Sequence, residues 1–154
     1  MLQSIQKKTT TAQGENFVIV ASQYNARYVD AMLRAAQSEI RRAGGKVQVI
    51  RVPGAYEIPV VAASVARAKK VSGIICLGVI LRGATTHAQH IGEAVSNALV
   101  LIQVQHEIPV IHEVLLLENE QQARERCLDK KHNRGTEAAQ TALAMAQVMN
   151  RLRA

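Results

Sequence analysis

A histidine that directly follows a short polar turn is the part of this chain best suited to chemistry. The turn, Arg82–Thr86 (RGATT), comes after the apolar run Gly73–Leu81 (GIICLGVIL), and a helical pattern begins at His87. Such an apolar run is typical of a strand buried on both faces. A turn that contains Gly83, between a strand and a helix, leaves backbone N–H groups unpaired and suits an anion, most often a phosphate. Since an imidazole exchanges its proton near neutral pH, the segment predicts a phosphate pocket with a proton-transfer group beside it.

The residues around His87 fit the pattern of a capping box. Thr86 takes the N-cap position, and Gln89 is spaced to reach back to it. This places His87 at the first helical position, where the positive end of the helix favours a neutral ring that accepts a proton. The alternative is a surface histidine at a helix start.

Three further segments offer groups for ligand binding. In the loop Pro53–Pro59 (PGAYEIP), small residues allow a ligand to approach the backbone, and Glu57 offers a carboxylate for hydroxyl groups. Tyr24 follows the first expected strand and is placed to stack on a flat ligand. Arg126 lies in a short helix and is a candidate phosphate ligand. Each has a plainer alternative: a rigid turn, a tyrosine packed on its turn, and a solvated helix charge.

Strands and helices alternate along the chain, and these elements must position the residues above. The pattern predicts strands at 17–22, 46–52, 73–81 and 109–117, and helices at 27–43, 59–70, 87–105, 119–128 and, lastly, up to about 152. This order predicts an α/β fold: a three-layer α/β/α sandwich with a central four-stranded parallel sheet, flavodoxin-like, in a single domain. The domain is expected over 16–154, after a flexible N-terminal tail at 1–15. Ligands of such sheets bind beyond the carboxyl ends of the strands.

The composition excludes several classes of function. The net charge is +7, but the basic residues are scattered, and one Phe, three Tyr and no Trp leave few rings for stacking bases, so no nucleic-acid partner is expected. No apolar run reaches the roughly 18 residues that span a bilayer, and no signal peptide is visible, so a cytoplasmic protein without a membrane partner is expected. Cys76 and Cys127 lack metal-type spacing and are interpreted as reduced structural thiols.

One expected helix indicates assembly. The segment Ile91–Val104 carries apolar or small residues nearly all round, and a helix of this kind is buried on all sides. In a domain this small the sheet covers only one face of the helix, so the other face is expected to meet a second copy of the chain. We therefore expect a homo-oligomer.

Taken together, the loops resemble the lumazine synthase (6,7-dimethyl-8-ribityllumazine synthase) family of riboflavin biosynthesis. The resemblance runs from about Phe17 to the end of the chain, and its most specific motifs are VPGAYEIP at 52–59 and LGVILRGATTH at 77–87. Further matches are Tyr24-Asn25, Glu125-Arg126 and Asn133–Gly135. The resemblance implies a transferase that condenses 5-amino-6-(D-ribitylamino)uracil with 3,4-dihydroxy-2-butanone 4-phosphate and releases phosphate and water. It implies no metal and no organic cofactor.

The resemblance also implies a role for individual residues. His87 would be the catalytic residue and transfer protons, Tyr24 would stack on the pyrimidine, and Glu57 would bind the ribityl hydroxyls. The substrate-binding residues would be Tyr24, Asn25, Ala55, Tyr56, Glu57, Val79, Ile80, Leu81, Gly83, Ala84, Thr85, His112 and Arg126. The family forms pentamers with active sites between adjacent subunits, to which His112 and Arg126 would come from the neighbour. Larger assemblies, a dimer of pentamers or a 60-mer shell, are left open.

Several positions depart from the family pattern. His112-Glu113 stands where Phe followed by Gly is usual, Ala88-Gln89-His90 stands where the pattern is aromatic, acidic, aromatic, and Arg134 replaces Lys. Because these changes alter the pocket wall and the surroundings of His87, a second interpretation is a lumazine- or flavin-binding or scaffold paralogue with weak or no catalysis. A third is an unrelated α/β domain that binds another phosphorylated ligand.

Overall fold

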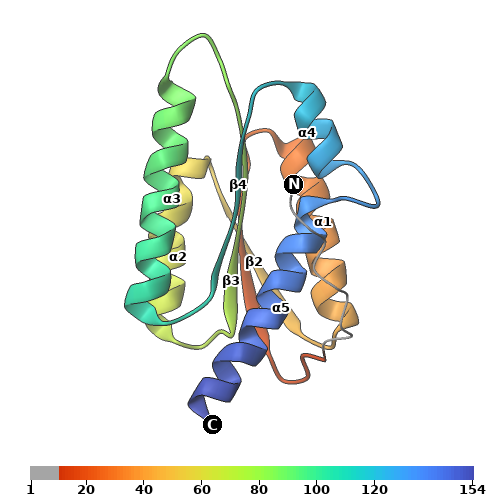
Figure 1. Cartoon of the computed structure of the whole chain (residues 1–154), viewed down its shortest axis with the longest axis vertical. Coiled ribbons are helices and arrows are strands. Elements are labelled where there is room, and N and C mark those ends of the chain that lie inside the picture. The colour runs from red at the N-terminus through yellow and green to blue at the C-terminus, as the bar shows by residue number, and fades with distance from the viewer. Residues whose placement is uncertain (1–10) are drawn as a thin grey trace.

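Four strands form the centre of the computed structural model, which describes residues 11–154 (Figure 1). They are β1 (Asn16–Ser22), β2 (Lys46–Val52), β3 (Gly73–Leu81) and β4 (Val110–Leu117). All pair in parallel, in the order β2-β1-β3-β4. The central strands β1 and β3 are almost entirely buried, whereas the edge strand β2 alternates polar and apolar residues and is only partly covered.

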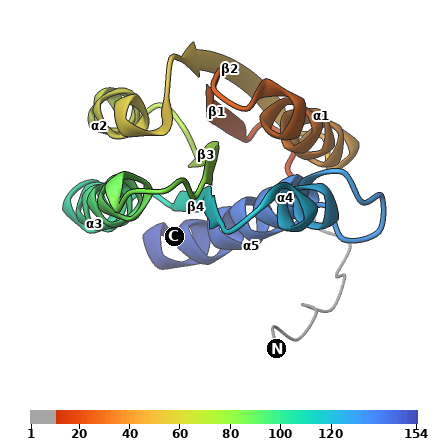
Figure 2. The same ribbon diagram turned by 90° about the horizontal axis from the view of Figure 1, so that it is seen from above.

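Five helices cover the two faces of the sheet. They are α1 (Ala26–Arg42), α2 (Ile58–Ala68), α3 (His87–His106), α4 (Glu120–Cys127) and α5 (Arg134–Arg153), and a 3₁₀ turn, η1 (Ala55–Glu57), precedes α2. Figure 2 shows α2 and α3 on one side of the sheet, and α1, α4 and α5 on the other. The predicted three-layer α/β/α sandwich with a four-stranded parallel sheet is confirmed, with strand and helix bounds within about two residues of those expected.

Alternate residues of the central strands supply two separate cores. Phe17, Ile19 and Ala21 of β1 pack with residues of α1 and α5, whereas Val18 and Val20 pack with α2 and α3. Successive side chains of a strand point to opposite faces of the sheet. A strand covered on both faces must therefore be apolar at every position, which is the pattern that predicted β1 and β3.

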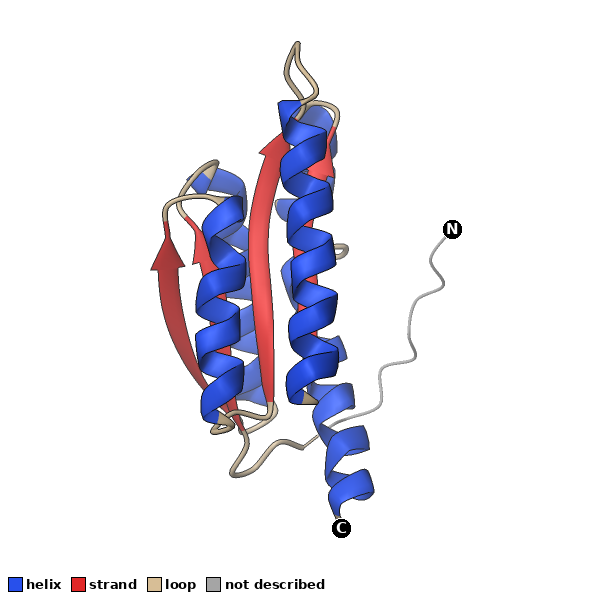
Figure 3. Ribbon diagram, turned by 90° about the vertical axis from the view of Figure 1, so that its left-hand side faces the viewer, coloured by secondary structure: helices blue, strands red, loops and turns tan. Residues whose placement is uncertain are grey.

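The four strands run in the same direction, so the loops that follow them gather at one edge of the sheet, the one formed by the carboxyl ends of the strands (Figure 3). This edge receives the loops after β1, β2 and β3 that the sequence marked for ligand binding, together with the start of α4. Arg126 lies near the end of α4, and His112 lies within β4. The fold thus concentrates the candidate chemistry at the place where open parallel sheets bind ligands. Across residues 11–154, no helix is long and apolar enough to cross a membrane.

The described part of the predicted N-terminal tail, residues 11–15, is packed against the domain. Ala12 is buried, and its N–H donates a hydrogen bond to the carbonyl oxygen of Ala43 at 2.7 Å. The N–H of Lys46 donates to the carbonyl oxygen of Glu15 at 2.9 Å. These residues therefore brace the turn between α1 and β2. Residues 1–10 lie outside the described part, and the tail expected there stays a prediction.

The start of α5 lies directly against the backbone of α1. A Cβ atom at Gly135 would lie 2.0 Å from the backbone oxygen of Met32, far inside contact distance. Only glycine fits at this crossing, which fixes where α5 begins relative to α1.

Replacing Gly135 by alanine is therefore expected to destabilise the fold, by about 3 kcal/mol or more, because a backbone must move to admit the methyl group. The measurement is the urea unfolding midpoint at fixed protein concentration. Gly83→Ala is the control, since a Cβ there meets nothing within 4 Å, and its midpoint should match that of the wild type. An unchanged midpoint for Gly135→Ala would contradict the close packing of α1 on α5.

Candidate active site

Hydrogen bonds join the loops after β1 and β2 to each other and to β3. The N–H groups of Gln23 and Tyr24 both donate to the carbonyl oxygen of Pro53, at 3.2 and 3.1 Å. The side-chain amide of Asn25 donates to the carbonyl oxygen of Val79 at 2.7 Å. Asn25 has a left-handed backbone, with φ of 56°, which asparagine tolerates better than most residues. The three segments therefore form one connected surface at the sheet edge, and Asn25 holds the Tyr24 turn against β3.

Two tyrosines of this surface point into solvent. The side chains of Tyr24 and Tyr56 are 77% and 64% exposed. This overturns the plainer alternative in which Tyr24 packs on its own turn, and it leaves the ring free to stack on a ligand. Ala55, directly before Tyr56, is buried in the core beneath the loop.

The carboxylate of Glu57 closes its own turn. Its Oε2 accepts a hydrogen bond from the N–H of Gly54 at 3.0 Å, and Pro59 follows in the first turn of α2, as predicted. A Cβ at Gly54 would lie 2.9 Å from that same oxygen, so a side chain there would displace the Glu57 carboxylate. Glu57 remains exposed, with its carboxylate held at the surface of the loop.

The capping box predicted at the start of α3 is wrong. Thr86 is the N-cap residue but makes no side-chain capping bond, and its backbone (φ −77°, ψ 4°) lacks the extended form that such a cap needs. Gln89 instead donates to Glu93, one turn further along, at 2.9 Å. The predicted place of His87 at the first helical position is correct, and its side chain is exposed.

The missing cap has a chemical consequence. Within residues 11–154, the N–H groups of Ala88 and Gln89 have no hydrogen-bond acceptor, and the N–H of His87 has only a long contact of 3.4 Å with Oγ1 of Thr85. Residues 82–87 are solvent-accessible. The helix start therefore presents free donors to an anion, in the way expected of a phosphate site.

His112 lies on the edge strand β4 and faces α3. Its Nδ1 accepts a hydrogen bond from the N–H of Val114 at 3.2 Å, so the ring proton belongs on Nε2, which lies 2.7 Å from Oγ of Ser96. Partial burial lowers the pKa of His112, since the charged ring loses hydration there. The ring is thus a neutral, oriented group at the edge of the sheet.

An open groove of about 510 Å³ lies between α3 and β4, beside His112. Its lining includes Arg82, Glu93, Ser96, Val114 and Leu116. The groove lies along the edge strand β4, whereas Tyr24 and Ala55 lie on the loops after β1 and β2. It is a second surface beside the loop cluster, and the sequence pattern did not predict it.

Arg126 does not meet His87 within one chain. Its helix, α4, packs on the face of the sheet that α1 and α5 cover, through Ala123 and Cys127. η1 and α3 lie on the opposite face (Figure 2). Arg126 itself is exposed at the end of α4. The sheet therefore separates the candidate phosphate ligand from the turn that precedes His87.

Comparison with known proteins shows which family the chain belongs to. The family model described as 6,7-dimethyl-8-ribityllumazine synthase matches residues 14–150. A protein of that name from Buchnera aphidicola is 37% identical over 150 residues, which cover 95% of this chain and 94% of the relative. Another, from Aquifex aeolicus, is 38% identical over 146 residues, 93% of this chain and 95% of the relative. The chain belongs to the 6,7-dimethyl-8-ribityllumazine synthase family.

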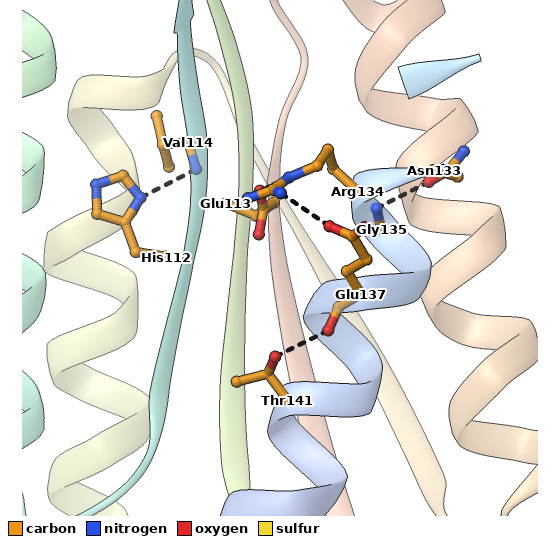
Figure 4. A network of polar contacts seen from close by, with 8 residues as sticks. All are labelled: His112, Glu113, Val114, Asn133, Arg134, Gly135, Glu137 and Thr141. Carbon is orange, nitrogen blue, oxygen red and sulfur yellow. Dashed lines mark hydrogen bonds and ion pairs between the residues drawn. The ribbon is translucent and has the colours of Figure 1, made fainter. Parts of the chain in front are cut away.

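Two departures from the lumazine synthase pattern, Glu113 and Arg134, turn out to be partners. Nε of Arg134 donates to Oε1 of Glu113 at 2.7 Å, and Nη1 lies 2.8 Å from Oε2 of Glu137 (Figure 4). Glu113 is only 5% exposed; burial raises the pKa of its carboxyl group, and the Arg134 bond opposes that rise. An acidic residue inside an apolar strand (PVIHEVLLL) is the signal from which a buried partner could have been inferred, although no such partner is among the predictions from the sequence. Periodicity gave no means to choose that partner among the basic residues of other elements.

The environment of His112 predicts a pH effect on stability. Because its pKa is lower in the folded chain than the ordinary 6.5, the unfolded chain binds more protons between the two values. Its contribution is therefore complete above pH 6.5 and is lost as the pH falls through and below that value. The free energy of unfolding of the wild type, minus that of His112→Asn, should fall between pH 7 and pH 5. A difference that stays constant over this range would contradict the assigned environment.

Proposed function

We propose that this protein forms 6,7-dimethyl-8-ribityllumazine from 5-amino-6-(D-ribitylamino)uracil and 3,4-dihydroxy-2-butanone 4-phosphate, with release of phosphate and water. The observation that carries the proposal is the helix start at His87, where free N–H donors and an exposed imidazole adjoin. Membership of the lumazine synthase family supplies the reaction, a step of riboflavin biosynthesis. The residues around His87 supply the anion-binding and proton-transfer groups that this reaction needs.

The reaction needs an anion site and a proton carrier next to each other. The amine of the uracil attacks the ketone and loses water to give an imine; phosphate then leaves, and attack of the second amine closes the ring with loss of another water. Gly83, Ala84 and Thr85, together with the free N–H groups that follow them, would hold the phosphate as it departs. His87 would accept and return protons at the first helical position.

The pyrimidine substrate fits the connected loop surface. The exposed ring of Tyr24 would stack on the flat heterocycle, and the backbone of Val79, Ile80 and Leu81 would meet its polar edge. Asn25 would keep Tyr24 in place through its bond to Val79. Ala55, Tyr56 and Glu57 would line the ribityl chain, with Glu57 accepting hydrogen bonds from its hydroxyls. Holding both substrates in reacting geometry accounts for much of the rate gain.

A second subunit would complete this site. Arg126 lies across the sheet from His87 in its own chain, so it reaches a phosphate site only in a neighbour; His112 on the edge strand would enter the same neighbouring site. We propose a pentamer with active sites between adjacent subunits, and the assembly of pentamers into a decamer or a 60-mer is a further level. A cytoplasmic location agrees with Cys76 and Cys127, which are both free thiols.

Exposed apolar residues mark the surface that the neighbour would cover. On α2 and α3, Val60 is 71% exposed, Leu101 67% and Val104 69%. Both helices lie side by side on one face of the sheet (Figure 3). This supports the homo-oligomer expected from the apolar pattern of α3.

Leu101→Glu is expected to break the assembly, because burying an unpaired carboxylate costs on the order of several kcal/mol per copy. Light scattering behind a sizing column would report a smaller particle than the wild type. Ser38→Glu, a charge added to an exposed position of α1, should leave the particle unchanged. A Leu101→Glu protein with the wild-type mass would show that the neighbour does not cover this helix face.

His87→Ala is expected to lower kcat by roughly a hundredfold while the oligomer survives, since the loss is that of a proton-transfer group on an exposed side chain. Lumazine formation is followed by absorbance after mixing both substrates, with the spontaneous rate subtracted. His90→Ala, an exposed histidine one turn further along, serves as the control. Unchanged turnover would refute the role of His87, and tight binding of the uracil without turnover by the wild type would favour the paralogue instead.

A further inference from the structure

Glu113 is a buried carboxylate for which the proposed reaction has no direct use. It lies on β4 next to His112, on the face covered by α5, and is 5% exposed. A charge in this position is costly without a partner, and Nε of Arg134 provides one at 2.7 Å. Because Arg134 also meets Glu137 at 2.8 Å, its guanidinium is held from two sides.

This ion pair sits at the join between α4 and α5. Asn133, directly before Arg134, caps α5: its Oδ1 accepts from the N–H of Gly135 at 2.8 Å. The amide of the same side chain donates to the carbonyl oxygen of Cys127 at 2.6 Å. Cys127 is the last residue of α4 and directly follows Arg126. A continuous set of contacts thus leads from Glu113, through Arg134 and Asn133, to the residue beside Arg126 (Figure 4 shows its first part).

The helix that carries Arg126 is short, and at this end it packs through Cys127 and the adjacent Leu128. It has eight residues, of which only Ala123 and Cys127 are buried. After Leu128 the connection is polar, and Asn133 is its one fully buried member. Asn119 and Tyr28, which bind Gln122 and Glu120, hold the opposite end of the helix. The hydrogen bond from Asn133 to Cys127 is therefore the polar contact that ties this end of the helix, next to Arg126, to the start of α5.

The same network leaves Arg126 available to an anion. Glu113 lies close enough to both guanidiniums for each to lower the pKa of its carboxyl group, yet it bonds only to Arg134. Within residues 11–154, Arg126 forms no ion pair and donates no side-chain hydrogen bond. A planar, unpaired guanidinium at the end of a helix matches a phosphate monoester.

We propose that Glu113 is a positioning residue for phosphate recognition. Through Arg134 and Asn133 it sets the place of Arg126, which binds the phosphate of the butanone substrate in the adjacent subunit's site. The proposal rests on the proposed function for its substrate. The broader claim, that Arg126 binds a phosphate monoester and that Glu113 positions Arg126, does not depend on turnover.

The test is steady-state kinetics of Glu113→Gln in the assembled protein. We expect KM for the butanone phosphate to rise roughly tenfold, as for coupled neighbouring groups, while kcat and KM for the uracil change less than about twofold. Glu39→Gln is the matched control. Glu39 is also a largely buried carboxylate that pairs with an arginine and accepts from α5, through Gln140, but it lies on α1. Its kinetics should match those of the wild type.

Kinetics of the double variant Glu113→Gln/Arg126→Gln separate a positioning role from a general structural effect. If Glu113 acts through Arg126, adding Glu113→Gln to Arg126→Gln changes KM for the phosphate substrate no further. Equal rises in both KM values, a fall in kcat alone, or a full additional rise in the Arg126→Gln background would overturn the proposal. Should Glu113→Gln fail to assemble, Asn133→Ser, which keeps a cap but loses the reach to Cys127, must give the same selective rise in KM.

Binding of inorganic phosphate distinguishes this proposal from the proposed function. Titration followed by ³¹P NMR should show weaker binding to Glu113→Gln than to the wild type, by a factor similar to the rise in KM. A wild type that forms no lumazine but shows this difference refutes the reaction and supports the role of Glu113. A wild type that forms lumazine, with equal phosphate binding by both proteins, refutes the role of Glu113 alone.

Discussion

The parallel pairing of β1 with β3 is the constraint on which the site depends. Phe17 to Ala21 align with Gly73 to Leu77, so β1 ends one residue past this pairing while β3 continues to Leu81. This alignment lets the amide of Asn25, after β1, bind the carbonyl oxygen of Val79. It also places the Tyr24 turn beside the segment that leads to His87. A shift of one residue would turn the side chains of either strand to the wrong core, which is why the register is fixed.

The sheet that brings these loops together also divides the site. The loops after β2 and β3 lead into α2 and α3, and the loop after β1 is hydrogen-bonded to Pro53 and Val79. In contrast, α4 packs on the opposite face with α1 and α5. A layer of side chains on each face keeps Arg126 away from the His87 turn. Under the proposed function, one subunit would offer half a site at its loops and the other half across the sheet, an arrangement suited to a closed assembly in which each copy completes the next. The exposed apolar face of α2 and α3 agrees with that arrangement.

Much of the fold could be predicted because its signals are local. β3 and β1 are uninterrupted apolar runs, and Gly44-Gly45 and Pro59 mark where helices end and begin. The start of α3 shows the limit of such signals. Thr86 and Gln89 have the spacing of a capping box, but Glu93 one turn on bonds Gln89 instead, and the backbone of Thr86 is not extended. Spacing alone does not tell which of two nearby partners a side chain takes.

By itself the sequence determined the layers, the parallel sheet, the grouping of the candidate loops at one edge and the position of His87 at a helix start, because each follows from periodicity or from adjacent residues. Only the tertiary structure decided that Glu113 pairs with Arg134, that Asn133 ties α5 to the end of α4, and that the sheet separates Arg126 from His87. These contacts join residues from different elements. Their energy depends on burial and distance, which are properties of the folded chain. Such contacts produce no periodic pattern in the sequence from which they could be predicted.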